Sequence, residues 1–381
     1  EIQEVTFIGG PDGTYHLGAV VDVWNDVIEL REDNNAAGGR IGVGYMPDLV
    51  VSALSIPPSV TPGAFFNAEV TVCNEGTVPS WGSFLELFAA QDPDVSLDDV
   101  PVGGAPTPML EPGACAPVTI PASLWGPDGA HYLRAFADRF ESEQELFEDN
   151  NQSAARRIGV GWAPDLVVTA VEGPPSAAPG SPLTISVTCC NEGTVPSSYS
   201  DVWTFLSEDA TITEDDSMIA PAPVPPLEPG ACATVSAQGN AWSMGPDGAR
   251  YLGAIIDPME SHLEIFEDNN AVAGDRIGIG YGPDLVVRAV AAPPSATPGW
   301  PIEVTATICN DGTAPSWGGG SVRLVSTLDD VISQADPLLF EQWFPSLLPG
   351  ECQDFQASVQ LYGPEGAYRV GAVADPNANV P

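Results

Sequence analysis

The sequence predicts an all-β chain of tandem β-sandwich domains arranged as a rod. Two observations carry this prediction. The run Pro-Asp-Leu-Val-Val begins at Pro47, Pro164 and Pro283, at intervals of 117 and 119 residues. Units of this length are too long for solenoid repeats and suit globular domains. The chain also holds 39 Gly and 39 Pro, with short β-branched runs between them, which is typical of short strands joined by tight turns.

The repeats divide the chain into four parts. Residues 1–46 match only the last part of a repeat, whereas residues 47–163 and 164–282 are complete. Residues 283–381 reach the end of the sixth strand and lack the seventh. A partial sandwich exposes an unpaired sheet edge, so we expect further repeats beyond both ends, or strands of neighbouring copies that cover them.

Each complete repeat has the pattern of seven strands. Turns rich in Pro, Gly and Asx separate them, for example Pro-Pro-Ser-Val-Thr-Pro-Gly after the first strand and Gly-Pro-Asp-Gly before the sixth. In the first complete repeat the expected strands are residues 48–56, 68–74, 81–90, 99–104, 115–124, 131–138 and 156–162.

Six of the seven cysteines recur as one pair in each repeat, 42 or 43 residues apart. The chain has no Cys-x-x-Cys motif and only three His, so a disulfide framework fits better than zinc. Disulfides indicate an extracytoplasmic protein. The expected pairs are Cys73 with Cys115, Cys190 with Cys232, and Cys309 with Cys352.

Alternation along the second strand predicts which face each cysteine occupies. Ala68, Val70 and Val72 point toward the core, which places Cys73 on the outer face. Each pair would therefore join neighbouring strands on the outside of one sheet. Cys189 takes an inward position, where we expect a buried free thiol that packs as a small apolar residue; an intermolecular disulfide or a reactive thiol is the alternative.

The formal net charge is −41, and all 11 basic residues are arginine. This charge argues against nucleic acid and anionic membranes as partners. The absence of lysine rules out a Schiff-base lysine, a phosphate-loop lysine and a Lys–Asn isopeptide crosslink. No stretch of the sequence is apolar for long enough to span a membrane.

The order of motifs resembles the CARDB family, the cell-adhesion-related domain found in bacteria. The motifs are Pro-Asp-Leu-Val-Val, Pro-Pro-Ser-x-x-Pro-Gly, Val-Thr-Val-Cys-Asn-Glu-Gly-Thr, Leu-Glu-Pro-Gly-Ala-Cys, Gly-Pro-Asp-Gly-x-x-Tyr-Leu and Glu-x-x-Glu-Asp-Asn-Asn. The resemblance extends over nearly the whole chain. It implies immunoglobulin-like sandwiches in tandem on secreted or cell-surface proteins, with adhesive or scaffolding roles. The cysteine pair is not general to the family and marks a sub-type.

An acidic segment, Asp-x6-Glu-x2-Glu-Asp-Asn-Asn, occurs three times before the seventh strand. Topology places it at the end of the sandwich where the previous domain attaches, near Asp48 and Glu75. Carboxylates this close repel one another unless a proton or a cation neutralises them, and oxygen ligands suit Ca²⁺. A solvated acidic loop without metal is the alternative. The candidate ligands are Asp22, Glu29 and Glu32; Asp138, Glu145 and Glu148; and Asp257, Glu264 and Glu267.

Other signals are weaker. His16, His131 and His262 do not occupy equivalent positions, and no nucleophile recurs beside them, so we expect no enzyme. Trp81 and Trp317 form either an aromatic platform for sugar or, as we expect, part of the packing between sheets.

The sequence thus predicts a non-catalytic extracellular or bacterial cell-surface protein, a stiff disulfide-linked rod or filament. Its expected partners are further repeats of the same chain, neighbouring copies, and a cell-surface or glycan ligand. The alternative is a carbohydrate-binding or spacer array attached to a secreted enzyme. Short connections between domains would give stiffness, and the negative charge would give solubility.

Overall fold

The structure, a computed structural model, describes residues 11–21, 23–24, 26, 35–242, 247–362 and 366–376. Within these ranges every regular element is a β-strand, so the predicted all-β class is confirmed. No helix in the described part of the chain has the length and apolar character needed to cross a membrane. The chain divides into two compact units. One holds residues 1–165 with segments 192–196 and 263–266, and the other holds the rest.

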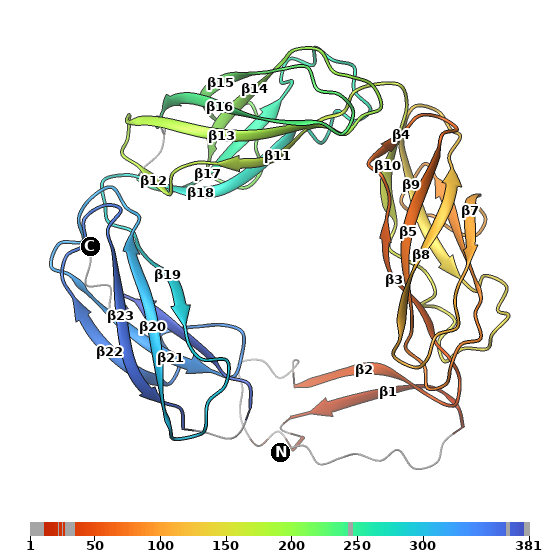
Figure 1. The fold of residues 1–381 in the computed structure, drawn as a ribbon, viewed down its shortest axis with the longest axis horizontal. Helices are drawn as coiled ribbons and strands as arrows, with labels where there is room; N and C mark the ends of the chain where they lie inside the picture. The colour runs from red at the N-terminus through yellow and green to blue at the C-terminus, as the bar shows by residue number, and fades with distance from the viewer. Residues whose placement is uncertain are drawn as a thin grey trace. The chain divides into compact units, whose positions relative to one another are not determined.

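The first unit contains an antiparallel hairpin and one β-sandwich (Figure 1). One layer of the sandwich has the strand order β3-β5-β8, and the other has the order β7-β6-β9-β10-β4. A single pair, Gly103 with Ala122, joins the layers at one edge. The strands are β1 (Gly13–Val20), β2 (Ala36–Val43), β3 (Leu49–Ser55), β4 (Ser59–Val60), β5 (Phe65–Asn74), β6 (Phe84–Ala90), β7 (Val100–Pro106), β8 (Cys115–Ser123), β9 (Gly129–Ala137) and β10 (Arg156–Val160).

The second unit repeats this topology. Its first eight strands form one layer with the order β11-β13-β16 and another with the order β12-β18-β17-β14-β15. These strands are β11 (Leu166–Glu172), β12 (Ser176–Ala177), β13 (Pro182–Asn191), β14 (Ser200–Ser207), β15 (Ser217–Val224), β16 (Cys232–Asn240), β17 (Gly248–Ile256) and β18 (Ala271–Ile279).

The remaining strands form two three-stranded layers, β19-β20-β23 and β22-β21-β24. They are β19 (Leu285–Ala291), β20 (Pro301–Asn310), β21 (Gly320–Thr327), β22 (Leu338–Phe344), β23 (Cys352–Gln360) and β24 (Arg369–Ala374).

One strand in each complete repeat was not predicted. The Pro-Pro-Ser-Val-Thr-Pro-Gly run reads as a turn, yet Ser59–Val60 pairs in parallel with β10, and Ser176–Ala177 pairs in the same way with β18. The prolines lack backbone donors and end the first strand, so the chain crosses to the other layer. A period-2 signal cannot be detected in two residues, which is why each complete repeat has eight strands rather than the expected seven.

The faces of β5 are those expected from alternation. Ala68, Val70 and Val72 are at most 1% exposed and lie in the core of the first sandwich. In β13 the inward position equivalent to Val72 is Cys189, which is fully buried and unpaired. Burial raises the pKa of this thiol to about 12, so it packs as an apolar group rather than reacting as a thiolate.

Three disulfides join neighbouring strands. In each, the two cysteines lie directly opposite one another in an antiparallel pair. Cys73 is buried although it lies on the outer face of its sheet, because its partner and the hydroxyl of Ser52, 3.4 Å from its sulfur, lie beside it. The bonds are Cys73–Cys115, Cys190–Cys232 and Cys309–Cys352.

Candidate functional site

The acidic segment of the first sandwich runs between β9 and β10 and begins with a tight turn at Asp138. Asp138 has a φ of 46°, in the left-handed region that Asp tolerates because its short side chain bonds locally. Its carboxylate accepts hydrogen bonds from the Ser83 hydroxyl at 2.8 Å and from the backbone N–H groups of Ser142 and Glu143 at 3.1 and 2.8 Å. Burial opposes ionisation, but these donors outweigh it and hold the pKa of Asp138 below its ordinary value.

Glu145 is the most deeply buried acid of this segment, with 5% of its surface exposed. One carboxylate oxygen accepts from the backbone N–H of Leu49, at the start of β3, and the other accepts from the amide of Asn151 at 2.9 Å. Burial, with the nearby charges of Glu148 and Asp138, raises the pKa of Glu145 to about 8. Near neutral pH this carboxyl therefore needs either a proton or a cation.

Acceptor oxygens without donors surround Glu145. Glu143 accepts from the backbone N–H of Trp81 through one oxygen at 2.7 Å, while its other oxygen is buried and has no hydrogen-bond partner. The side-chain oxygens of Asn150 and Asn151 are in the same state. Each unsatisfied buried acceptor costs roughly 1–3 kcal/mol. A cation would satisfy several of them at once, since carboxylate and amide oxygens are its usual ligands.

A cavity of about 190 Å³ lies beside this segment, and Asp138, Glu141, Glu148 and Asn151 are among its lining residues. Glu148 is exposed and accepts the backbone N–H of Glu145 at 2.9 Å. The structure therefore brings Asp138, Glu145 and Glu148 together in one loop.

Asp48 also belongs to this end of the sandwich. It is 3% exposed, and the Asn150 amide donates to it at 3.0 Å. Burial raises the pKa of Asp48, with a further contribution from the charge of Glu75. Glu75 itself is exposed, and its backbone N–H donates to the Asp48 carbonyl at 2.8 Å. The two carboxyl groups predicted near the acidic segment therefore occupy different environments, one buried and one exposed.

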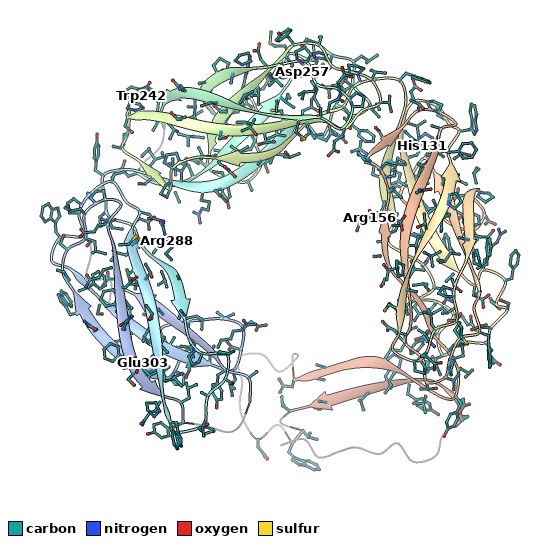
Figure 2. All side chains as sticks on the ribbon, viewed as in Figure 1. His131, Arg156, Trp242, Asp257, Arg288 and Glu303 are labelled. Carbon is teal, nitrogen blue, oxygen red and sulfur yellow. A yellow bond between two sulfur atoms is a disulfide. The ribbon has the colours of Figure 1, made fainter. Side chains whose placement is uncertain are left out.

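The corresponding segment after β17 repeats the turn with a different third residue. Asp257 has a φ of 47° and accepts the backbone N–H of His262 at 2.8 Å. The ring nitrogen Nδ1 of His262 lies 3.1 Å from the same carboxylate. Asp257, His262 and Glu264 each offer one ligand atom, and these atoms lie within 4.8 Å of one another. Figure 2 shows Asp257 and Trp242 toward opposite ends of this sandwich.

Glu143 and His262 were not among the predicted ligands, although both belong to one pattern. In Asp138-x4-Glu143 and Asp257-x4-His262 the fifth residue after the aspartate returns toward its carboxylate. The substitution of Glu by His concealed the equivalence. Of the other predicted ligands, Glu267 is exposed, and Asp22, Glu29 and Glu32 lie outside the described residues.

Ser198, His262 and Asp257 form a chain of hydrogen bonds. The Ser198 hydroxyl lies 2.8 Å from His262 Nε2, and His262 Nδ1 faces Asp257. This order is that of a serine hydrolase triad. In the first sandwich the same link between loops consists of the Trp81 backbone and Glu143, which contain no nucleophile. The shared feature is therefore the connection between the loops.

Two tryptophans expected to pack between sheets are instead exposed. Trp81 is 82% exposed and Trp317 is 70% exposed, and Tyr199 nearby in the second repeat is 75% exposed. The expectation of packing is therefore wrong. Each residue lies in the connection that enters the strand β6, β14 or β21, outside the alternating part of the strand, so no inward position is imposed on it.

Comparison with known families decides the classification. The CARDB family model matches residues 46–155 and 163–274, more than half of the chain. The chain belongs to the CARDB family. A search of curated proteins finds no match.

Several solved structures are similar to parts of this CARDB chain. A CARDB domain from Pyrococcus furiosus, in complex with di-metal ions, is 20% identical, with 31% of this chain and 97% of that chain covered and a TM-score of 0.26. A domain of a putative cell surface protein from Methanosarcina acetivorans is 23% identical, with 30% and 92% covered and a TM-score of 0.25. Red sea bream transglutaminase is 14% identical, with 62% and 31% covered and a TM-score of 0.30.

Proposed function

We propose that this CARDB protein is a non-catalytic structural or adhesive protein of the extracellular space or the bacterial cell surface, in which disulfide-linked sandwiches form a stiff rod or filament. The observation that carries this proposal is the cross-strand disulfide found once in each sandwich. Such bonds persist in oxidising compartments. The repeated fold and the net charge of −41 suit a soluble, repetitive assembly.

We also propose that Ca²⁺ organises the acidic segment. In the first sandwich the ligands would come from Glu145, Glu148, Glu143 and the amide oxygen of Asn151, with Asp138 holding the turn. The support is the raised pKa of Glu145 and the buried acceptors without donors beside it. A bound cation would keep Glu145 ionised and fix the segment against the start of β3 through Leu49. It would thereby limit motion at this end of the sandwich.

The non-catalytic assignment is supported by the two loops that carry Ser198 and His262. The equivalent loops of the first sandwich are linked without a serine or a histidine, so the link itself does not require chemistry. We assign it to holding the loops together.

Electron microscopy of the purified protein, with immunolabelling of the cells that produce it, tests the structural role. Filaments or rods on the outer surface are the expected result. An intracellular location or rapid hydrolysis of ester substrates by the wild type, lost in Ser198→Ala, would overturn it.

The exposed aromatic residues favour a second candidate function, carbohydrate binding. Trp81 and Trp317 present large apolar surfaces to solvent, and such surfaces stack against sugar rings as they do in other binding sites. A glycan array probed with wild type and Trp81→Ala tests it. Binding to a defined glycan that weakens at least tenfold in the variant would support a carbohydrate-binding array, and uniform absence of binding would reject it.

A further inference from the structure

A repeated pair of apolar side chains in the acidic segment fits a notch on a Gly-containing strand. In Arg-Ile-Gly-Val-Gly, residues 40–44 and 157–161, the first glycine leaves room that a neighbouring side chain fills. A Cβ added to Gly42 would lie 2.9 Å from the Cβ of Leu146, and one added to Gly159 would lie 2.6 Å from a methyl carbon of Ile265. Each notch is therefore occupied.

The residue after the aliphatic one makes the second contact. The Arg40 guanidinium lies 3.9 Å from the centroid of the Phe147 ring, and that of Arg157 lies 3.7 Å from the centroid of the Phe266 ring. Arg40 also forms an ion pair with Asp149 at 2.6 Å. Stacking of a guanidinium on an aromatic face and pairing with a carboxylate are both favourable.

A backbone hydrogen bond completes the arrangement. The N–H of Leu146 donates to the Pro47 carbonyl at 2.9 Å, and the N–H of Ile265 donates to the Pro164 carbonyl at 3.0 Å. Leu146, Ile265 and Phe266 are less than 10% exposed as a result. Two copies thus share one recognition pattern, which consists of a glycine notch, an arginine and a proline carbonyl.

The third copy of this pattern, Arg276-Ile-Gly-Ile-Gly on β18, has its notch open. A Cβ on Gly278 would meet nothing closer than 3.7 Å. Arg276 is exposed, with its guanidinium 5.6 Å from the Tyr251 ring of its own sandwich. A cavity of about 620 Å³ is lined by Arg276, Gly278 and Pro283, together with residues at the start of β17 and in the connection after β20. The strands that border it can be followed in Figure 1.

We propose that this cavity is a docking site for a segment of the chemistry Glu-(Leu/Ile)-Phe-Glu-Asp carried by a further repeat of the same type. The aliphatic side chain would enter the notch at Gly278, the phenyl ring would lie under Arg276, and the acid would pair with the same arginine. No such segment occurs in residues 366–381. The proposal rests on the proposed role as a repetitive assembly, and it names the surface through which one repeat would be added to the next.

A labelled peptide with the sequence of residues 261–270, titrated with the full chain, tests this docking. We expect saturable binding that weakens at least tenfold with Gly278→Val, which fills the notch, with Arg276→Ala, and with alanine in place of the peptide phenylalanine. Gly278 has no left-handed φ, so valine is compatible with its strand. Arg156→Ala on β10, which removes an exposed arginine far along the sequence, is the matched control and should leave binding unchanged.

Disulfide trapping extends the test to weak binding. A peptide with cysteine at the position of Ile265 should form a mixed disulfide with Gly278→Cys at least tenfold faster than with Thr211→Cys, an exposed position on the same unit. Equal trapping at both positions, or peptide binding that Gly278→Val leaves unchanged, would overturn the proposal. Either result would leave the surface location and particle shape seen by microscopy, and hence the proposed function, to stand on their own.

Discussion

The backbone N–H of Leu49 donates a hydrogen bond to the carboxylate of Glu145, which lies 96 residues later in the chain. Leu49 opens β3 and is fully buried. The bond therefore ties the acidic segment to the first strand of the sandwich. It also explains why a charged residue is tolerated in the interior at this point, because the carboxylate satisfies a backbone donor that would otherwise have no partner.

The pH dependence of stability should reveal Glu145. Its pKa is about 8 when folded, against an ordinary value of 4.5, so the folded state binds the extra proton. Without metal, stability is therefore full below about pH 4.5 and is lost as the pH rises through 8, by up to about 1.4 kcal/mol per pH unit. Thermal unfolding in chelator between pH 5 and 9 measures this slope. Glu145→Gln should flatten it, and an identical slope in the variant would contradict the assignment.

The turn at Asp138 should be essential to the segment. Asp138→Ala removes the acceptor for the Ser83 hydroxyl and for the backbone N–H groups of Ser142 and Glu143. We expect a loss of about 2–3 kcal/mol, in line with several unsatisfied buried donors. Hydrogen exchange of residues 138–146 should accelerate. Glu111→Ala, at an exposed position, is the control, and unchanged exchange in Asp138→Ala would refute the role.

Removal of one disulfide should destabilise its sandwich. Closing a loop of 42 residues, as Cys73–Cys115 does, limits the unfolded chain by about 4 kcal/mol on a chain-entropy estimate. The double variant Cys73→Ala/Cys115→Ala should therefore unfold at a clearly lower temperature in calorimetry. Cys189→Ala, which removes only the buried free thiol, should cost less, about 1 kcal/mol or below. The reverse order of the two effects would show that the disulfide contributes little.

The Ser198 hydroxyl should be chemically ordinary. Because the link to His262 has a counterpart in Trp81 and Glu143 without a nucleophile, we expect no labelling by a fluorophosphonate probe at concentrations that label a serine hydrolase. Mass spectrometry of the Ser198 peptide provides the measurement, with Ser198→Ala as the control. Stoichiometric labelling of wild type alone would show an activated serine and would count against the non-catalytic assignment.

Periodicity predicted the fold well because a sandwich strand exposes one face and buries the other. The inward series Ala68, Val70 and Val72 on β5 followed directly from alternation. The β4 strand was missed because it has only two residues. Trp81 and Trp317 were misplaced because burial in a connection depends on where the loop lies in the fold, which alternation does not encode.

The acidic site was only partly predictable. The repeated Asp and Glu positions indicated a cluster, but spacing could not show that Asp138 serves the turn while Glu145 is buried. Those roles depend on donors far away in the sequence, such as Ser83 and Leu49. His262 was missed because its equivalence to Glu143 is visible only once both turns are seen in three dimensions.

Calorimetric titration of the chain with Ca²⁺ at pH 7 and low salt tests the central claim most directly. The proposed site predicts saturable binding and an unfolding temperature that rises with Ca²⁺, since binding to the folded state adds about 2.7 kcal/mol at a hundredfold excess over Kd. Glu148→Gln should weaken the first-sandwich site, while Glu111→Gln, away from the segment, should not. No binding at millimolar Ca²⁺, with the same unfolding temperature in Ca²⁺ and in chelator, would show that the acidic segment holds its place by hydrogen bonds and a proton alone.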